Sequence, residues 1–137
     1  MIVAVEIVVG DQPPADILAA AEALEAACRS RGFAVQRLAA PTTLDNRLCL
    51  YLATAQGGYP LDALLDRGVR RDAFVRLDHT QFLVRSWLAA ARRHIALAAK
   101  SGPALLNAAR LVATRIAAQQ DFSHLDIQGP QHAPERD

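Results

Sequence analysis

Lysine is almost absent from this chain, because Lys100 is the only one among 137 residues and arginine carries nearly all the positive charge. Aromatic residues make up only 5% of the chain, which argues against a nucleic-acid-binding surface built on stacked bases. No apolar run reaches the about 18 residues of a transmembrane helix. The N-terminus also lacks the basic segment and cleavage site of a signal peptide. We therefore expect a cytoplasmic protein that does not bind a membrane.

Cysteine and histidine are also scarce. Cys28 and Cys49 lie in apolar patterns without a Cys-x-x-Cys motif, which predicts buried free thiols rather than a disulfide or zinc site. No metal-binding spacing relates the four histidines, which are His79, His94, His124 and His132. A P-loop, a dinucleotide-binding glycine motif and a nucleophile elbow are missing as well. The sequence predicts no cofactor and names no reaction.

The distribution of charge is the most informative feature that the chain does have. Residues 1–66 contain four arginines and eight acids, a balance of −4. Residues 67–120 contain nine arginines, one lysine and two acids, a balance of +8. Residues 121–137 have a balance of −3. Such asymmetry indicates an acidic partner, or contact between the acidic and basic halves of two copies.

Alanine is the commonest residue, with 28 copies, and large apolar side chains are few. Since each alanine contributes little burial, a core of this composition gains from association, and we expect a homo-oligomer, most simply a dimer. The abundance of alanine and arginine is typical of a GC-rich bacterial genome.

The hydrophobic pattern predicts an α+β fold. Apolar and β-branched runs predict four strands, at 2–9, 33–38, 47–54 and 73–77. Helical spacing predicts four helices, at 15–31, 61–67, 79–100 and 104–120. This order is that of a ferredoxin-like split βαβ fold with a C-terminal helical hairpin. If residues 69–78 are helical instead, the fold is α/β or mainly helical.

The ferredoxin-like order has specific consequences for the sheet. Its strands take the order 4-1-3-2, so strands 2–9 and 48–54 should be adjacent and parallel. One face would carry Val8, Tyr51 and Phe74, which is too apolar for water and needs cover from the two last helices or a second chain.

The same pattern predicts the domain organisation. We expect one domain over residues 1–122. Its sheet-containing part spans 1–78 and its helical hairpin 79–120, and a polar flexible tail follows at 123–137.

The helix expected at 79–100 is the strongest prediction, because Asp78 and Gln81 have the spacing of a capping box. It would carry much of the basic charge, and the last helix would continue it. The predicted partner-binding residues are Arg85, Arg92, Arg93, Arg110 and Arg115. We interpret the protein as an interaction or regulatory module that binds an acidic protein. A solvated face and a nucleic-acid-binding module are the alternatives, although no nucleic-acid-binding motif is present.

Glu6 is the only charge in the first strand. A buried carboxylate needs a partner. The expected sheet order brings Glu6 to the same face as Arg76, so we predict that its carboxylate meets Arg76 in an ion pair, or else a hydroxyl. The competing function is a small enzyme with a pocket between the sheet and the C-terminal helices. Its candidate catalytic residues are Glu6, Tyr51, Arg76 and His79.

Overall fold

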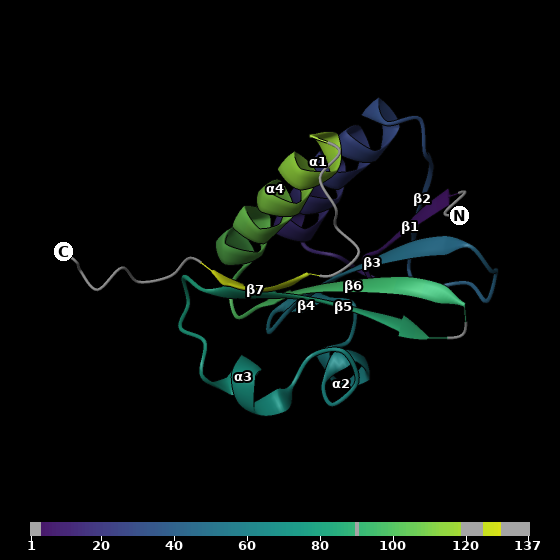
Figure 1. The fold of residues 1–137 in the computed structure, drawn as a ribbon. Coiled ribbons are helices and arrows are strands. Elements are labelled where there is room, and N and C mark those ends of the chain that lie inside the picture. The colour runs from purple at the N-terminus through teal and green to yellow at the C-terminus, as the bar shows by residue number, and fades with distance from the viewer. Residues whose placement is uncertain (1–3, 90, 119–124, 130–137) are drawn as a thin grey trace.

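The computed structural model describes residues 4–89, 91–118 and 125–129, and its core is one mixed sheet with helices on both faces (Figure 1). The strands are β1 (Ala4–Val8), β2 (Ala34–Leu38), β3 (Arg47–Thr54), β4 (Gly57–Gly58), β5 (Phe82–Ala89), β6 (Arg92–Ala99) and β7 (Asp126–Gly129). The helices are α1 (Ala15–Ser30), α2 (Leu61–Leu64), α3 (Arg71–Val75) and α4 (Gly102–Ala117). The fold is therefore α+β, as predicted.

The strand order is β2-β1-β3-β6-β5-β7, with β4 paired to the end of β3. Strands β2, β1, β3 and β6 are parallel to one another, whereas β5 and β7 are antiparallel to their neighbours. The prediction that strands 2–9 and 48–54 are adjacent and parallel is confirmed, since Val5 pairs with Leu48 and Val8 with Tyr51.

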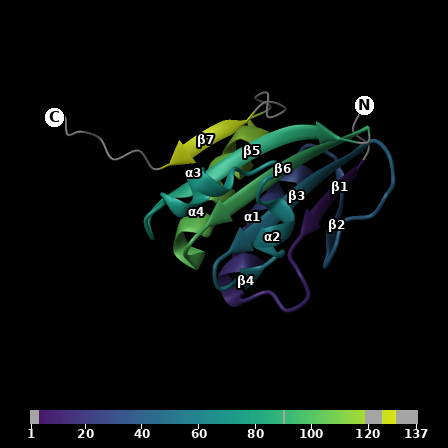
Figure 2. The same ribbon diagram turned by 90° about the horizontal axis from the view of Figure 1, so that it is seen from below.

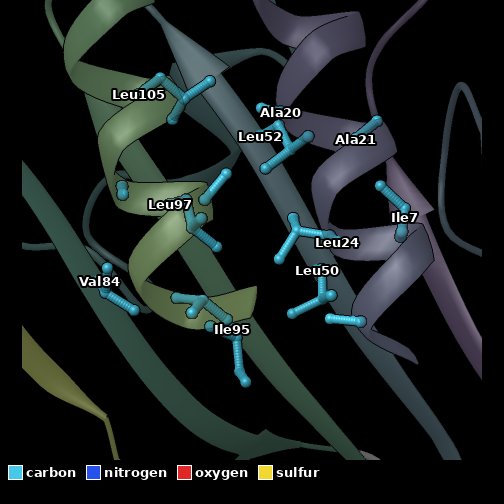
Figure 3. Close-up of a cluster of buried hydrophobic side chains, with 14 of the residues drawn as sticks. Ile7, Ala20, Ala21, Leu24, Leu50, Leu52, Val84, Ile95, Leu97 and Leu105 are labelled. Atoms are coloured by element: carbon cyan, nitrogen blue, oxygen red, sulfur yellow. The ribbon is translucent and has the colours of Figure 1, made fainter. Parts of the chain in front are cut away.

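Helices α1 and α4 pack side by side on one face of the sheet (Figures 1 and 3). Small residues on their buried sides, such as Ala20 and Ala108, let the helices approach the strands closely. Leucines from the strands, among them Leu50 and Leu97, fill the space between (Figure 3). Helix α4 begins where Ser101 caps it, because the Ser101 hydroxyl accepts a hydrogen bond from the Ala104 amide at 3.2 Å.

The opposite face of the sheet is covered by residues 59–78, which include α2 and α3 (Figures 1 and 2). Leu64, Phe74 and Leu77 from this segment are buried against Val8 and Tyr51 of the sheet. We expected the C-terminal helices or a second chain to cover this face, and that expectation is wrong because α4 lies on the α1 side. We call the side covered by residues 59–78 the α2–α3 face.

The prediction of a helix at 79–100 is wrong. Residues 82–99 form the antiparallel hairpin of β5 and β6. Asp78 therefore caps no helix, although its amide donates to Gln81 Oε1 at 3.0 Å and the Thr80 amide donates to Asp78 Oδ1 at 2.8 Å. This local turn leads into a strand, so the domain part 79–120 is not a helical hairpin.

Burial of both faces explains the mistake. Val84, Ile95 and Leu97 point to the α1–α4 side, while Leu83 and Ala96 point to the α2–α3 side. A strand that is apolar on both faces has no alternating pattern, so its residues also satisfy helical spacing. The turn between the strands, in an alanine run, carries no glycine or asparagine to mark a hairpin.

Three further predictions differ from the structure. The segment 73–77 is not a strand, because helix α3 occupies 71–75, so the alternative of a helix within 69–78 is correct there. The ferredoxin-like order is not confirmed, since β1 lies between β2 and β3. Residues 126–129, expected in a flexible tail, form β7 and pair with β5, whereas 123–124 and 130–137 lie outside the described residues.

The hairpin makes a stability prediction. Leu97→Ala should lower the free energy of unfolding by about 2–5 kcal/mol, because Leu97 is fully buried in the α1–α4 core. Leu88→Ala should change it by less than about 0.5 kcal/mol, because Leu88 is 64% exposed. Urea denaturation measures both. Equal effects of the two substitutions would contradict the strand assignment.

Candidate functional site

Polar and aromatic side chains form one row across the α2–α3 face. The register pairs Glu6 of β1 with Cys49 of β3, Cys49 with His94 of β6, and His94 with Trp87 of β5. Paired residues lie side by side on the same face of a sheet. The row therefore places a buried carboxylate at one end and an aromatic cluster at the other.

The buried end of the row is an ion cluster made of Glu6, Thr42, Cys49 and Arg92. Arg92 Nη2 lies 2.6 Å from Glu6 Oε1 and 2.6 Å from Cys49 Sγ, and the Arg92 guanidinium also donates to the Thr42 carbonyl. Thr42 donates to Glu6 through its amide, at 3.1 Å, and through its hydroxyl. Arg47 Nε approaches the same carboxylate at 4.0 Å. The Glu6 side chain is 1% exposed, so these contacts replace its hydration.

The electrostatics of the cluster favour a structural role. Burial alone would raise the pKa of the Glu6 carboxyl, but hydrogen bonds from Thr42 and Arg92 outweigh it and hold the pKa below its ordinary value. Burial raises the pKa of the Cys49 thiol to about 11. Glu6 is thus a stable anion surrounded by donors, and Cys49 is a protonated thiol, so neither is poised to take a proton or attack a substrate.

The predicted ion pair of Glu6 with Arg76 is wrong, since Arg92 is the partner. Arg76 follows α3 and is exposed, whereas Arg92 begins β6, two strands away from β1. The expectation that Glu6 is buried and paired is correct, and so is the predicted alternative of a hydroxyl partner, since the Thr42 hydroxyl donates to Glu6. The sequence does not reveal the Arg92 partner, because the spacing of residues 79–100 predicts a helix with Arg92 on its basic side.

The other end of the row opens into an aromatic pocket of about 320 Å³. Its lining residues are Tyr51, Tyr59, Ala63, Leu64, Arg67, Trp87, Ala89 and His94. Trp87 lies nearly parallel to His94, with ring centroids 5.0 Å apart, and Tyr51 lies beside both. Gly68 rests against Trp87 so closely that a Cβ there would overlap the ring, and this contact joins the α2–α3 segment to β5.

Tyr51 and His94 form a neutral hydrogen-bonded pair within this pocket. Tyr51 Oη lies 2.9 Å from His94 Nδ1. Burial lowers the pKa of His94, and the Arg92 charge lowers it further. Burial also raises the pKa of the Tyr51 hydroxyl. Near neutral pH the pair therefore carries no net charge.

A second hollow, which we call the arginine hollow, lies on the outer side of the α2–α3 segment and has a volume of about 610 Å³. Its lining residues are Asp66, Arg67, Arg70, Arg71, Asp72, Val75 and Arg76. Four arginines and two aspartates give it a balance of +2. Arg67 lines both the arginine hollow and the aromatic pocket, so the two lie next to each other.

The five arginines predicted to bind a partner do not share one surface. Arg92 is buried in the ion cluster, and Arg85 pairs with Asp126 at 2.9 Å and donates to the Ile127 carbonyl. Arg93 lies on β6 beside Leu88 of β5. Arg110 is exposed and Arg115 half-buried on α4, on the other side of the sheet.

The four candidate catalytic residues are not brought together either. Only Tyr51 lines the aromatic pocket, while Glu6 belongs to the ion cluster. Arg76 lines the arginine hollow, and His79 is exposed in the turn before β5. The sequence analysis did not identify His94, Trp87 or Arg67 as lining residues. The one signal for Arg67 was that it begins the basic stretch 67–120.

Comparison with family models and with curated proteins finds no match to this chain. Within the described part of the chain, no cluster of three or more His, Cys, Asp or Glu side chains is placed to hold a metal ion. Among the same residues, no helix is long and apolar enough to cross a membrane. Functional inference therefore depends on the two hollows and the ion cluster.

The ion cluster yields a double-mutant prediction. Glu6→Leu and Arg92→Met should each lower the free energy of unfolding by about 3–5 kcal/mol, because each leaves a buried charge without its partner. The double variant should lose clearly less than the two together, because it removes both charges. Denaturant melts of the four proteins measure the coupling. Additive losses would show that the pair is not coupled.

His94 yields a pH prediction. Because its pKa is lower in the folded protein, the unfolded chain takes up a proton first as the pH falls through about 6.5. The stability that neutral His94 contributes is complete above that pH and is lost toward the lower folded pKa. The free energy of unfolding should thus fall less between pH 7 and 5 in His94→Gln than in the wild type. His79→Gln, which replaces a histidine outside the aromatic pocket, is the matched control.

Proposed function

We propose that this protein is an interaction module that binds an acidic protein surface through the arginine hollow. The observation that carries the proposal is the clustering of Arg67, Arg70, Arg71 and Arg76, four arginines from ten consecutive residues, around one open hollow. Guanidinium groups bind carboxylates with two parallel hydrogen bonds, so such a cluster suits an acidic protein. The basic stretch 67–120 thus supports a partner-binding role, but through its first four arginines rather than the five that the sequence predicts.

The arginines of the hollow are available to a partner. Arg70 and Asp72 form an exposed ion pair at 3.0 Å, and Arg71 and Asp66 form another at 3.1 Å. Exposed pairs of this kind contribute little stability, so a partner carboxylate can exchange with them at small cost. Arg67 is exposed and has no side-chain hydrogen bond or ion pair with any residue in the described ranges.

Self-association and a cytoplasmic location remain part of the proposal. The acidic half of a second copy could supply the partner surface, since exposed Glu22 on α1 and Asp62 on α2 belong to it. Both cysteines are buried and unpaired, which supports a reducing compartment. A small enzyme has less support, because its four predicted catalytic residues do not line one pocket.

The arginine hollow yields a binding prediction. Arg70→Glu with Arg76→Glu should weaken binding of poly-aspartate by at least about tenfold at low salt, because two of four cations become anions. Arg29→Glu with Arg110→Glu makes the same change in net charge at exposed positions on the α1–α4 side and should bind like the wild type. Isothermal titration calorimetry measures the affinities, and circular dichroism checks the fold.

Two outcomes would overturn the proposal. Equal weakening in both double variants would show that only net charge matters. Binding of duplex DNA tighter than about 1 μM at physiological salt would exceed the usual non-specific range and favour the nucleic-acid alternative.

Analytical ultracentrifugation of the wild type and the Arg70→Glu/Arg76→Glu variant separately tests self-association. The proposed dimer should dissociate in that variant if the hollow is its interface.

A further inference from the structure

We infer that the acidic partner carries an aromatic side chain that enters the aromatic pocket while its carboxylates occupy the arginine hollow. The inference rests on the proposed function and deepens it. It names the partner as an acidic segment with one aromatic anchor.

The two hollows are placed to act together. Arg67 belongs to the lining of both, and Gly68, the next residue, packs directly on Trp87 of the pocket. The segment from Arg67 to Arg76 thus links the lining of the pocket to the lining of the arginine hollow. A ligand that leaves the pocket past Arg67 meets the remaining three arginines at once.

The size and lining of the aromatic pocket suit one aromatic side chain. Its volume of about 320 Å³ lies at the small end of the range of about 300–1,000 Å³ for ligand pockets. Tyr59, Trp87 and His94 are half-buried, so their rings keep surface that an occupant can cover. Aromatic side chains in well-packed pockets supply much of the binding free energy in protein interfaces.

The charge around the pocket indicates which residues flank the aromatic side chain of the partner. His94 and Tyr51 are a neutral pair, so Arg67 is the only cation in the pocket lining. The hollow beyond it has a positive balance, and Val75 within it is 62% exposed, which adds apolar surface. Acidic residues next to the aromatic side chain satisfy this surface, whereas basic residues would be repelled.

Trp87 is the only tryptophan in the chain, so its fluorescence reports directly on the pocket. The probes are two short, end-blocked peptides of alternating Asp and Glu, one with a central Phe and one with Ala at that place. The Phe peptide should bind at least about tenfold more tightly than the Ala peptide and should shift the Trp87 emission. The Ala peptide should bind through the arginine hollow alone.

Filling the pocket provides the decisive variant. Ala63 lies in the pocket lining on α2, so Ala63→Leu should remove the advantage of the Phe peptide and leave the affinity for the Ala peptide unchanged. Ala26→Leu adds the same volume at an exposed position on α1 and should behave as the wild type. Equal affinities of the wild type for the two peptides would overturn the inference and leave the proposed function standing. Failure of both peptides to bind at low salt would overturn the proposed function as well.

Discussion

Strands β1, β3 and β6 are parallel and buried on both faces, so the chain has to cover each side of the sheet. Two sixteen-residue helices, α1 and α4, cover the central strands on one side. The other side is covered by residues 59–78, with two short helices, and by the loop of Thr42 over Glu6. This cover buries Tyr51 but leaves Trp87 and His94 half-exposed, and it turns its own arginines outward. The aromatic pocket and the arginine hollow both follow from this incomplete cover.

Burial of the central strands on both faces also explains the composition of the ion cluster. Glu6 lies on a central strand beneath the loop that joins β2 to β3, where water cannot reach it. Thr42 from that loop and Arg92 from β6 supply the donors that hydration would supply elsewhere. A buried pair of this kind adds little net stability compared with apolar packing, but it penalises any register that separates its members. The cluster therefore favours one alignment of β1, β3 and β6.

Much of the first half of the fold could be predicted, because its elements differ clearly in pattern. The run from 2 to 9 is β-branched, residues 15–31 have a helical stripe, and both became the expected elements. The hairpin at 82–99 could not, because burial on both faces removed the alternation that marks a strand. That one error also hid the partner of Glu6 and the pairing of Trp87 with His94. The arginines of residues 67–76 belong to the basic stretch 67–120 that the sequence shows, but only the structure shows that they surround one hollow.

The parallel pairing of β3 with β6 also shapes how the chain reaches this structure. Leu48 and Arg93 are partners although they are 45 residues apart, whereas Ala89 of β5 pairs with Arg92 of β6, three residues further along the chain. The hairpin can form early, since its contacts are local, but the centre of the sheet requires closure of a long loop before any contact compensates the lost entropy. Until that closure, the apolar edge of β6 has no neighbour. Folding at high concentration therefore competes with intermolecular strand pairing at β6.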